Sequence, residues 1–574
     1  MEAMKVYQQW LADFANDPET MADLKAIEND PAEIEDRFYR ELEFGTAGMR
    51  GVLGAGTNRL NIYNVRRVTR ALAKYILTTE NGKEQGVAIA YDSRNMSDVF
   101  AKQAALVLCA AGVKVFLYES LRPVPVLSFT IRHLKCIAGI VITASHNPKQ
   151  YNGYKAYWTD GGQMPPESVK GITDRIPETT YEESQPMDEQ AAIEAGLLNY
   201  IGKDVDDAYI AAVKKLSVNP ELAKEVGADL KIVYTPLHGS GNIPVRRIFD
   251  EIGMKNVYVV KEQELPDGNF PTVRVPNPEE KDAFNLALKM QAEIGADLCV
   301  GTDPDCDRVG IACMTENGPR LLNGNQIGCV LLHYILSQKK ERGILPENAA
   351  AVTTIVSTNM AAAIAKSFGC KMVEVLTGFK YIAEQIYLYE TTGCNTFQFG
   401  FEESFGYLSG TDVRDKDGVN ACMLIAEAAC WYKKKYNKTL VDAIDMLYQQ
   451  YGYYGDKVVS FVCPGKDGLE TMQNLMASLR ENPPKEFAGA KVVALRDYQK
   501  STRVEGDKVE EITLPKSNVL YFELENDAWI CVRPSGTEPK IKLYVNAVSD
   551  ASEKTQEALK AYADAAVEVL NSRM

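Results

Sequence analysis

The sequence has no long hydrophobic run and no paired cysteines, and each absence excludes a class of protein. No segment reaches the roughly 18 continuous apolar residues that a membrane-spanning helix requires. The amino-terminal stretch 1–13 is polar and lacks the apolar core of a secretion signal. The twelve cysteines form no CxxC pair, so we expect reduced, mostly buried thiols and no disulfide framework. These features predict a soluble, cytoplasmic protein that has no membrane partner.

Excess positive charge is also missing. The formal net charge is −15 at pH 7, and such a chain is repelled on average by nucleic acids and membrane surfaces, which are both anionic. We therefore expect no nucleic-acid partner, and an anionic substrate would need a locally basic pocket. Apolar residues make up 46% and charged residues 25% of the chain, which is the balance of an ordinary globular protein.

The length of 574 residues is too great for one hydrophobic core, because single cores stop growing at roughly 250–300 residues. No Pro/Gly/Ser-rich linker separates the expected domains. Residues 1–40 read as an amphipathic helical extension. A recurring strand–helix rhythm then indicates three similar α/β units, and short strands with polar turns after Tyr451 indicate an α+β domain. The predicted segments are 1–40, 41–205, 206–318, 319–453 and 454–574.

Strands are expected where short apolar runs lie between helical stretches. In the three α/β units the clearest runs are 86–91, 113–117, 136–142, 230–234, 257–260, 298–300, 350–356, 372–375 and 396–399. Ligands of open α/β sheets bind beyond the carboxyl ends of the strands. The polar motifs that follow these runs are therefore candidate site residues.

Ser145 lies in the first such motif, Thr143–Pro148, which is followed by the string Tyr151–Lys155. A hydroxyl in a strand-end loop backed by basic groups can attack phosphorus. The alternative is an ordinary Ser/Asn turn. A Ser–His hydrolase is disfavoured, because the chain around Ser145 has no GxSxG elbow and adjacent residues such as Ser145 and His146 rarely face each other.

The second motif, Gly301–Arg308, places aspartates at every other position. Asp303, Asp305 and Asp307 can converge on one hard cation, and Mg²⁺ fits because it takes oxygen ligands from a few carboxylates and a phosphate. An EF-hand is excluded, since its sixth and twelfth positions would be Arg308 and Met314. A solvated acidic turn is the remaining alternative.

Two further motifs are weaker when taken alone. The string Gly400–Gly406 carries a carboxylate and a hydroxyl, Glu402 and Ser404, that can hold vicinal sugar hydroxyls. The string Arg533–Lys540 combines small residues with a guanidinium, which suits phosphate oxygens. Each string has a plain alternative, a helix cap for the first and a β-turn for the second. No Walker A sequence is present.

The four motifs together, in this order, resemble the α-D-phosphohexomutase superfamily and its phosphoglucomutase branch. The resemblance covers the chain from about Phe44 to its end. Further matching strings are Gly45–Gly51, Tyr91–Arg94, Tyr234–Gly239 and Thr377–Lys380. The resemblance implies four domains around a central cleft, with an active-serine domain, a metal-binding domain, a sugar-binding domain and a carboxyl-terminal phosphate-binding domain.

The resemblance also implies a role for each candidate residue. Ser145 carries a phosphoryl group in the resting enzyme and, with the three aspartates, holds one Mg²⁺ ion. Lys155 is the candidate general acid/base, and His146, Arg50 and Arg308 support the reacting groups. The implied substrate-binding residues are Thr377, Gly378, Lys380, Glu402, Ser404, Arg533, Ser535, Gly536 and Thr537.

The implied reaction interconverts glucose 1-phosphate and glucose 6-phosphate, with glucose 1,6-bisphosphate as intermediate and activator. A glucose-1,6-bisphosphate synthase, a phosphomannomutase and a phosphopentomutase stay open as alternatives, and so does a non-catalytic sugar-phosphate-binding protein. A haloacid-dehalogenase-type phosphatase with Asp303 as nucleophile is disfavoured, because Asp307 stands where that motif has Thr or Val. The protein is expected to be a monomer or a homodimer.

Overall fold

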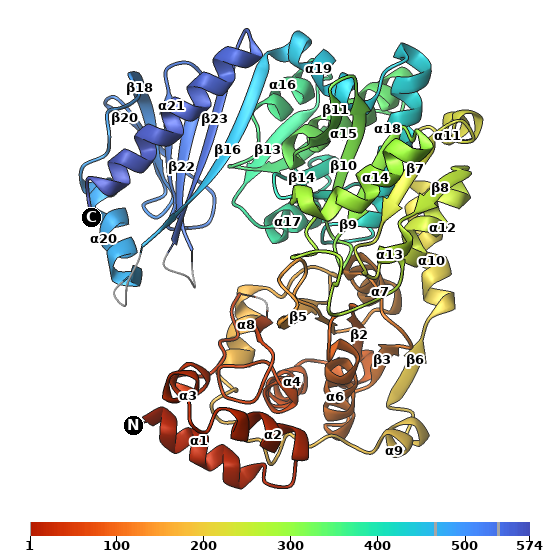
Figure 1. Ribbon diagram of the computed structural model, residues 1–574, viewed down its shortest axis with the longest axis vertical. Helices are drawn as coiled ribbons and strands as arrows, with labels where there is room; N and C mark the ends of the chain where they lie inside the picture. Colours follow the sequence, from red (N-terminus) through yellow and green to blue (C-terminus); the bar gives the residue numbers. More distant parts are fainter. Residues whose placement is uncertain (1, 47, 464–467, 536–539) are drawn as a thin grey trace. The chain divides into compact units, whose positions relative to one another are not determined.

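The computed structural model describes residues 2–46, 48–463, 468–535 and 540–574 (Figure 1). Internal contacts divide the chain into two units, Met1–Gly324 with Ala383–Val441 and Asn325–Ile382 with Asp442–Met574. Among the described residues, no helix is both long and apolar enough to cross a bilayer. All twelve cysteines are free, and eleven of them are buried.

The amino-terminal extension forms three short helices instead of one continuous helix: α1 (Glu2–Asp13), α2 (Pro18–Ala26) and α3 (Pro31–Phe38). Two Asp–Pro steps cause the interruptions, because proline cannot continue a helix but starts one well when the preceding aspartate caps it. An aromatic cluster that includes Tyr7, Trp10 and Tyr63 joins this extension to the next helix of the chain. The extension therefore packs on the body of the first unit.

Asp17 links the extension to the body by hydrogen bonds as well. Its carboxylate caps α2 by accepting from the backbone N–H groups of Glu19 and Thr20, and it accepts from the Tyr63 hydroxyl at 2.6 Å. Burial raises the pKa of Asp17, but the bonds from Tyr63 and Thr20 outweigh burial, so the net shift is downward. The ionised carboxylate is the form that both contacts stabilise.

Asp17→Ala should destabilise the amino-terminal region by about 2 kcal/mol, because it removes a helix cap and a hydrogen bond to a charged acceptor. Asp30→Ala is the matched control, since Asp30 caps α3 in the same way and should cost about 1 kcal/mol. Urea unfolding followed by tryptophan fluorescence measures both. Equal losses for the two variants would show that the bond to Tyr63 contributes nothing.

The first mixed sheet has the strand order β1-β5-β4-β2-β3-β6. Its strands β2, β3, β4 and β6 run parallel, and β5 is antiparallel to both β4 and β1. The strands are β1 (Gly48–Val52), β2 (Val87–Tyr91), β3 (Val115–Tyr118), β4 (Ala138–Ile142), β5 (Tyr151–Trp158) and β6 (Leu198–Ile201). The helices are α4 (Ile62–Ile76), α5 (Gly82–Gln85), α6 (Ser97–Ala110), α7 (Val124–Leu134), α8 (Pro166–Thr173), α9 (Glu189–Glu194), α10 (Lys203–Lys215) and α11 (Pro220–Val226).

The second mixed sheet has the order β11-β10-β9-β7-β8. Strands β7, β8 and β9 run parallel, and β10 is antiparallel to β9 and β11. The elements are β7 (Lys231–Thr235), α12 (Asn242–Ile252), β8 (Asn256–Val259), α13 (Lys261–Glu264), η1 (Lys281–Phe284), α14 (Asn285–Ile294), β9 (Leu298–Thr302), β10 (Val309–Thr315) and β11 (Gly318–Leu322).

A third series of strands and helices follows. Strand β12 pairs parallel with β13, and β14 pairs antiparallel with β15. The elements are α15 (Gly324–Glu341), β12 (Ala349–Thr354), α16 (Met360–Ser367), β13 (Lys371–Val375), α17 (Phe379–Thr392), β14 (Thr396–Glu402), β15 (Gly406–Leu408), α18 (Gly418–Tyr436) and α19 (Leu440–Tyr451).

The three series repeat one arrangement, which places the motifs at equivalent positions. Each series contains a hairpin of two antiparallel strands: β4 and β5, β9 and β10, and β14 and β15. The loops of these hairpins carry Ser145, the three aspartates and Ser404. The antiparallel strands β5, β10 and β15 are missing from the strands expected above, because glycine and polar residues interrupt their apolar pattern.

Strands β2, β7 and β12 end in the same turn. The N–H of the residue two positions later donates to a side-chain oxygen at the strand end: Arg94 to Asp92 at 2.9 Å, Leu237 to Thr235 at 3.1 Å and Val356 to Thr354 at 3.3 Å. Such turns are typical of Asp and Thr side chains that bond the local backbone. The third residue of the turn is charged only in the first series.

The carboxyl-terminal region forms an antiparallel sheet with the order β16-β23-β22-β21-β18-β19-β20, and β17 pairs with β18. Leu475 of one helix and Leu559 of the other belong to its hydrophobic core. The strands are β16 (Tyr453–Val462), β17 (Glu486–Phe487), β18 (Ala490–Asp497), β19 (Thr502–Glu505), β20 (Lys508–Glu511), β21 (Leu520–Leu524), β22 (Trp529–Pro534) and β23 (Lys540–Ser549). The helices are α20 (Gly468–Glu481) and α21 (Ser552–Asn571).

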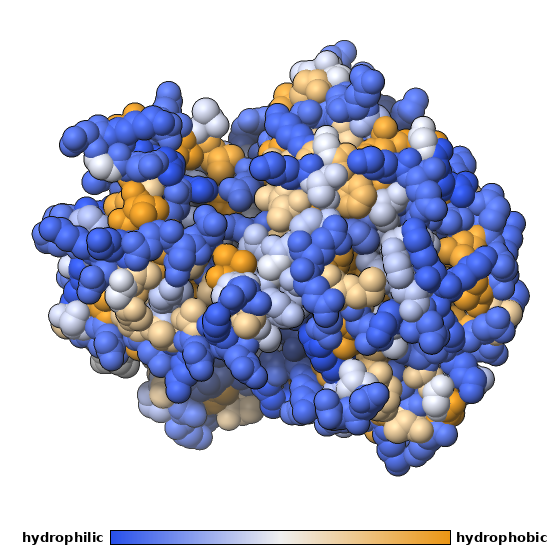
Figure 2. All heavy atoms as spheres, turned by 90° about the horizontal axis from the view of Figure 1, so that it is seen from above, coloured by the Kyte–Doolittle hydropathy of each residue, from blue (hydrophilic) through white to orange (hydrophobic). Residues whose placement is uncertain are grey.

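Hydrophilic residues dominate the face of the molecule seen in Figure 2, where hydrophobic residues appear only in small separate groups.

Candidate active site

The loop between β4 and β5 holds Ser145 in a left-handed backbone conformation with φ 51°. This conformation is uncommon for a non-glycine residue and persists where the surroundings hold it. The Ser145 N–H donates to Thr143 Oγ1 at 2.8 Å. The Ser145 side chain is buried, and its hydroxyl donates to Asp303 Oδ2 at 2.8 Å. This bond joins the loop of the first hairpin to the loop of the second.

His146 lies beside the serine hydroxyl, with Nδ1 3.1 Å from Ser145 Oγ. The expectation that these adjacent side chains would not face each other was wrong, because the left-handed turn breaks the alternation of side chains found in extended backbone. Burial and the cations Arg308 and Arg50 lower the pKa of His146 to about 2. The imidazole is therefore neutral at physiological pH.

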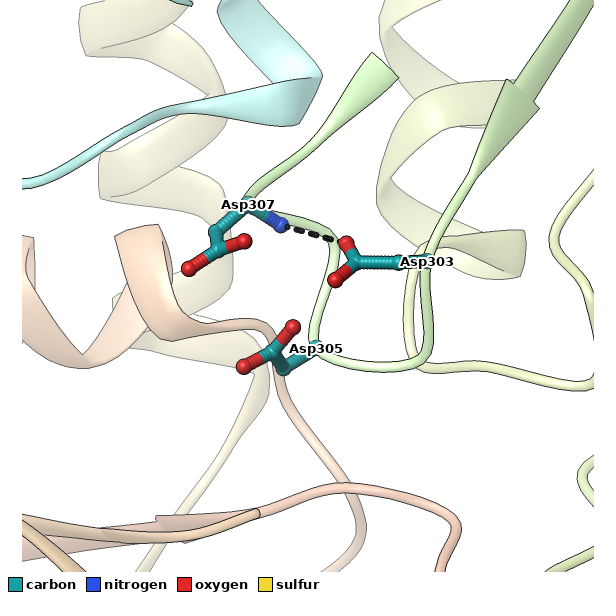
Figure 3. A group of neighbouring side chains, drawn as sticks. All are labelled: Asp303, Asp305 and Asp307. Carbon is teal, nitrogen blue, oxygen red and sulfur yellow. Dashed lines mark hydrogen bonds between the residues drawn. The ribbon is translucent and has the colours of Figure 1, made fainter. Parts of the chain in front are cut away.

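The loop between β9 and β10 gathers Asp303, Asp305 and Asp307 (Figure 3). One oxygen from each carboxylate lies within 4.8 Å of the others, and all three side chains are buried. Asp303 Oδ1 accepts the N–H groups of Asp307 and Arg308 at 3.1 and 3.0 Å, so the loop folds back on its first residue. The alternative of a solvated acidic turn does not fit this burial.

Two lysines neutralise part of the charge on these carboxylates. Lys155 Nζ donates to Asp305 Oδ2 at 2.9 Å, and Lys416 Nζ lies 3.1 Å from Asp307 Oδ2. Burial and the two neighbouring aspartates raise the pKa of Asp303. Burial also opposes ionisation of Asp305, but Lys155 outweighs it and the pKa of Asp305 is lowered. The cluster remains crowded with negative charge.

A divalent cation fits this donor set. Asp305 Oδ1 and Asp307 Oδ1 are buried and have no hydrogen-bond partner among the described residues. Buried polar atoms normally have a hydrogen-bond partner or a ligand, so these two unpaired oxygens indicate a binding site for a ligand. Three carboxylates offering only oxygen atoms suit Mg²⁺, which takes hard ligands from carboxylates and phosphates.

Lys416 is a residue of this site that the sequence reasoning missed. It lies in the loop between β15 and α18, where its ammonium contacts both Asp307 and, at 2.9 Å, Asp415 Oδ1. Asp415 in turn accepts from the Tyr157 hydroxyl at 2.8 Å. The available signal was the charged string Arg414–Asp417, which lies just before an apolar helix. The structure buries all four of its residues.

Arg50 and Arg308 lie at the edges of the two loops. Arg50 stands on β1 opposite Gly153, and its Nη1 donates to Asn147 Oδ1 at 3.1 Å in the serine loop. Arg308 ends the aspartate loop and forms an ion pair with Glu279. Both guanidinium groups bring positive charge to the region around His146, beside Ser145.

Glu402 and Ser404 lie at the third hairpin. The backbone carbonyl of Phe405 in this loop accepts from the Val309 N–H at 3.1 Å, which places the loop against the end of the aspartate loop. Glu402 is buried, and burial raises its pKa to about 7. Ser404 is partly exposed. Glu402 can therefore accept or donate a hydrogen bond near neutral pH.

The remaining candidates belong to the second unit. Thr377 follows β13, and its hydroxyl is buried without a hydrogen-bond partner among the described residues. Gly378 has φ 126°, a conformation that favours glycine. Lys380 lies in the first turn of α17, with Nζ 4.8 Å from the centre of the Tyr381 ring.

Arg533 lies on β22 opposite Lys542 of β23. The Ser535 N–H donates to the Lys540 carbonyl at 2.8 Å. Gly536 and Thr537 fall outside the described residues. The first unit thus brings together Ser145, His146, Lys155, Arg50, Arg308, the three aspartates and Glu402.

Comparison with known proteins places these features in one family. Models of the phosphoglucomutase/phosphomannomutase α/β/α domains I, II and III match residues 41–183, 207–317 and 323–451, and the model of the C-terminal domain matches residues 475–563. The phosphoglucomutase of Staphylococcus haemolyticus is 36% identical over 532 residues, which are 92% of this chain and 94% of that protein. These matches confirm the predicted fold class of three α/β domains followed by a different domain.

Two solved structures share the fold at low identity. The Paramecium phosphoprotein pp63/parafusin, a phosphoglucomutase, has a TM-score of 0.67 at 17% identity, with 93% of this chain and 95% of that chain covered. The N-acetylphosphoglucosamine mutase of Aspergillus fumigatus, solved with GlcNAc-6P and magnesium, has a TM-score of 0.50 at 13% identity, with 98% and 99% covered.

Proposed function

Because the chain belongs to the α-D-phosphohexomutase family of intramolecular phosphotransferases, we propose that it is a phosphoglucomutase that works through a phosphoserine at Ser145. The observation that carries this proposal is the 2.8 Å hydrogen bond from Ser145 Oγ to Asp303. A nucleophile held against a buried carboxylate cluster is what phosphoryl transfer with a cation requires. The substrates would be glucose 1-phosphate and glucose 6-phosphate.

One Mg²⁺ ion would be held by Asp303, Asp305, Asp307 and an oxygen of the phosphorylated Ser145. When bound, the cation would neutralise charge on the phosphoryl group that is transferred. The orphaned oxygens of Asp305 and Asp307 support this assignment, and so does the magnesium in the distant fungal mutase.

The protein side chains would carry out a balanced exchange. The bond from phosphorus to Ser145 Oγ breaks while a bond from phosphorus to a sugar oxygen forms, which gives glucose 1,6-bisphosphate. Lys155, as the neutral amine, would take up the proton of the attacking sugar hydroxyl, and the resulting ammonium would supply the proton that Ser145 Oγ gains as it leaves phosphorus. The neutral imidazole of His146 would orient Ser145 Oγ. The bisphosphate turns end over end, and its other phosphoryl group returns to Ser145. Free glucose 1,6-bisphosphate would act as an activator, because it phosphorylates an unloaded Ser145.

Binding of the sugar would fall to residues of the third hairpin and of the second unit. Glu402 and Ser404 would hold sugar hydroxyls, and Thr377, Gly378 and Lys380 would select the orientation of the ring. Arg533, Ser535, Gly536 and Thr537 would hold the phosphate that does not react. These roles, a cytoplasmic location and a monomeric or homodimeric state rest on the family resemblance.

A coupled assay tests the proposed substrate. The assay measures turnover of glucose 1-phosphate, mannose 1-phosphate and ribose 1-phosphate, each with and without added glucose 1,6-bisphosphate. A phosphoglucomutase prefers glucose 1-phosphate and is activated by the bisphosphate. Preference for mannose or ribose would indicate a phosphomannomutase or a phosphopentomutase. Turnover only with 1,3-bisphosphoglycerate as phosphoryl donor would indicate a bisphosphate synthase. No turnover of any sugar phosphate would contradict the proposal that the chain is an active phosphohexomutase.

Arg533→Ala should lower kcat/KM for glucose 1-phosphate by about 10- to 150-fold, because a lost charge-assisted contact costs about 1.5–3 kcal/mol. Part of the loss can fall on kcat, since binding of the distant phosphate helps to align the reacting end. The control is phosphoryl transfer to glucose without a phosphate, which should be slow in both proteins. An equal loss for the unphosphorylated sugar would exclude Arg533 as the ligand of that phosphate.

A further inference from the structure

Arg94 is a buried arginine behind the serine loop, at the end of the strand β2. Its side chain is fully shielded from solvent, yet its Nη2 donates to the carbonyls of Ser145 and Asn147 at 2.5 Å each. Its Nη1 donates to the carbonyls of Pro148 and Tyr151 at 3.1 and 3.0 Å. One guanidinium thus binds four backbone carbonyls of the segment that carries Ser145.

Asp92 forms an ion pair with Arg94 and is also linked to Ser145 by hydrogen bonds through Thr143. Its Oδ2 lies 3.4 Å from Arg94 Nε and accepts from the Thr143 hydroxyl at 2.6 Å. Thr143 Oγ1 accepts the N–H of Ser145. Asp92 therefore helps to hold both backbone groups of Ser145. Its partner Thr143 accepts the Ser145 N–H, and its partner Arg94 donates to the Ser145 carbonyl.

A loop of the second mixed-sheet region closes over the guanidinium. The Phe270 ring centre lies 5.1 Å from Arg94 Cζ, a distance typical of cation–π contact. In the same loop, a side chain on Gly268 would meet Asn95 N at 2.3 Å, so only glycine allows this approach. Phe270 and Gly268 thus pack this loop against the side chain of Arg94 and the backbone that follows it.

The repeated turns indicate that Arg94 is not needed to form its turn and therefore serves another role. The equivalent third residue of the turn is Leu237 in the second series and Val356 in the third, and both are buried apolar residues. The turn therefore forms and packs without a charged residue. A fully buried guanidinium is costly unless it is paired and bonded, and the first series is the one whose hairpin loop carries Ser145.

We propose that Arg94 is the positioning residue of the nucleophile, which fixes the loop 145–151 so that Ser145 Oγ stays at Asp303. This inference rests on the proposed function of Ser145. Arg94 acts through Ser145 and does not touch the substrate, since its bonds go to backbone carbonyls. Lysine cannot replace Arg94, because the donors of an ammonium lie on one nitrogen atom, whereas the guanidinium donates to the four carbonyls from two separate nitrogen atoms.

The test compares Arg94→Lys with the matched variant Arg67→Lys. Arg67 lies in the same domain and also donates to backbone carbonyls, those of Thr179 and Ile176, away from Ser145. Three quantities are measured in the full-length protein: kcat and KM for glucose 1-phosphate, the rate at which glucose 1,6-bisphosphate phosphorylates Ser145 by intact-protein mass, and the ³¹P NMR signal of the phosphoserine.

For Arg94→Lys we expect kcat and the phosphorylation rate to fall together by about 100-fold, the cost of misplacing a reacting group by about an ångström. KM should stay within about threefold, because no substrate contact is lost. The ³¹P signal should shift towards that of a solvent-exposed phosphoserine. Arg67→Lys should leave all three quantities nearly unchanged.

A phosphorylation rate equal to that of the wild type, or a rise in KM with kcat preserved, would overturn the proposal. Equal losses in both variants would assign Arg94 a purely structural role and would overturn it as well. If Arg94→Lys does not fold, Phe270→Leu replaces it, and we expect a smaller fall in the phosphorylation rate at unchanged KM, whereas no fall contradicts the proposal. Wild-type protein that never carries phosphate on Ser145 would instead refute the proposed function.

Discussion

Ser145→Ala should reduce turnover of glucose 1-phosphate on the order of 10⁵-fold, because the loss of a nucleophile removes the covalent route altogether. In the proposed mechanism the phosphoryl group is stored on the protein between the two half-reactions. The Ser145 hydroxyl contacts the aspartate cluster through Asp303, and alanine has no oxygen that could store the phosphoryl group. The coupled assay measures the loss, and phosphopeptide mapping of the wild type should find phosphate on Ser145.

Ser168→Ala is the control for this variant. Ser168 is also a buried serine in the same domain, where it accepts from the Tyr75 hydroxyl at 3.1 Å, and its loss should leave turnover nearly unchanged. Two results would refute the mechanism: full activity of Ser145→Ala, or phosphate found only on Asp303. The second result would point to an aspartyl-phosphate enzyme.

Asp305→Asn should weaken Mg²⁺ binding by more than about 100-fold, because loss of a direct ligand exceeds the 10- to 100-fold typical of outer-shell changes. Asparagine keeps the shape of the side chain but removes a charge from the cluster. Titration calorimetry with Mg²⁺ measures the affinity directly. Turnover should fall with it, and in the wild type chelation should abolish turnover and added Mg²⁺ should restore it.

Thermal unfolding gives an independent measure of the same site. A ligand that binds only the folded state stabilises it, so Mg²⁺ should raise the melting temperature of the wild type and not that of Asp305→Asn. Asp497→Asn is the control, because Asp497 is a buried aspartate that pairs with Arg480 in the carboxyl-terminal sheet. Full activity in chelator, with the metal shown to be gone, would exclude a metal role for the three aspartates.

The sequence was most informative where chemistry depends on residues close together in the chain. The spacing of Asp303, Asp305 and Asp307 predicted a cation site, and the three side chains do converge. The apolar runs predicted the parallel strands of the first two sheets except β6, because strands buried on both faces have nearly continuous apolar runs. Strand β6 is partly exposed and has no such run. The helical extension was also predicted, although its two Asp–Pro breaks were not used.

Contacts between distant segments could not be predicted in the same way. Lys416 lies 109 positions after Asp307, and no local pattern shows that their side chains meet. Arg94 was noted only as part of a matching string, since its bonds to the serine loop depend on how β2 and β4 lie side by side. The contact of Ser145 with His146 depends on one positive φ angle, which the residue type does not reveal.

The equivalent hairpins have a consequence for how this protein arose. Three copies of one strand arrangement, each with a different motif at the same corner, are what gene duplication followed by divergence produces. One copy carries Ser145, the next carries the acidic cluster, and the third carries Glu402 and Ser404. Each loop could change its chemistry while its hairpin strands stayed intact. Selection for a new sugar could therefore act on the third corner alone and leave the phosphoryl chemistry of the first two untouched.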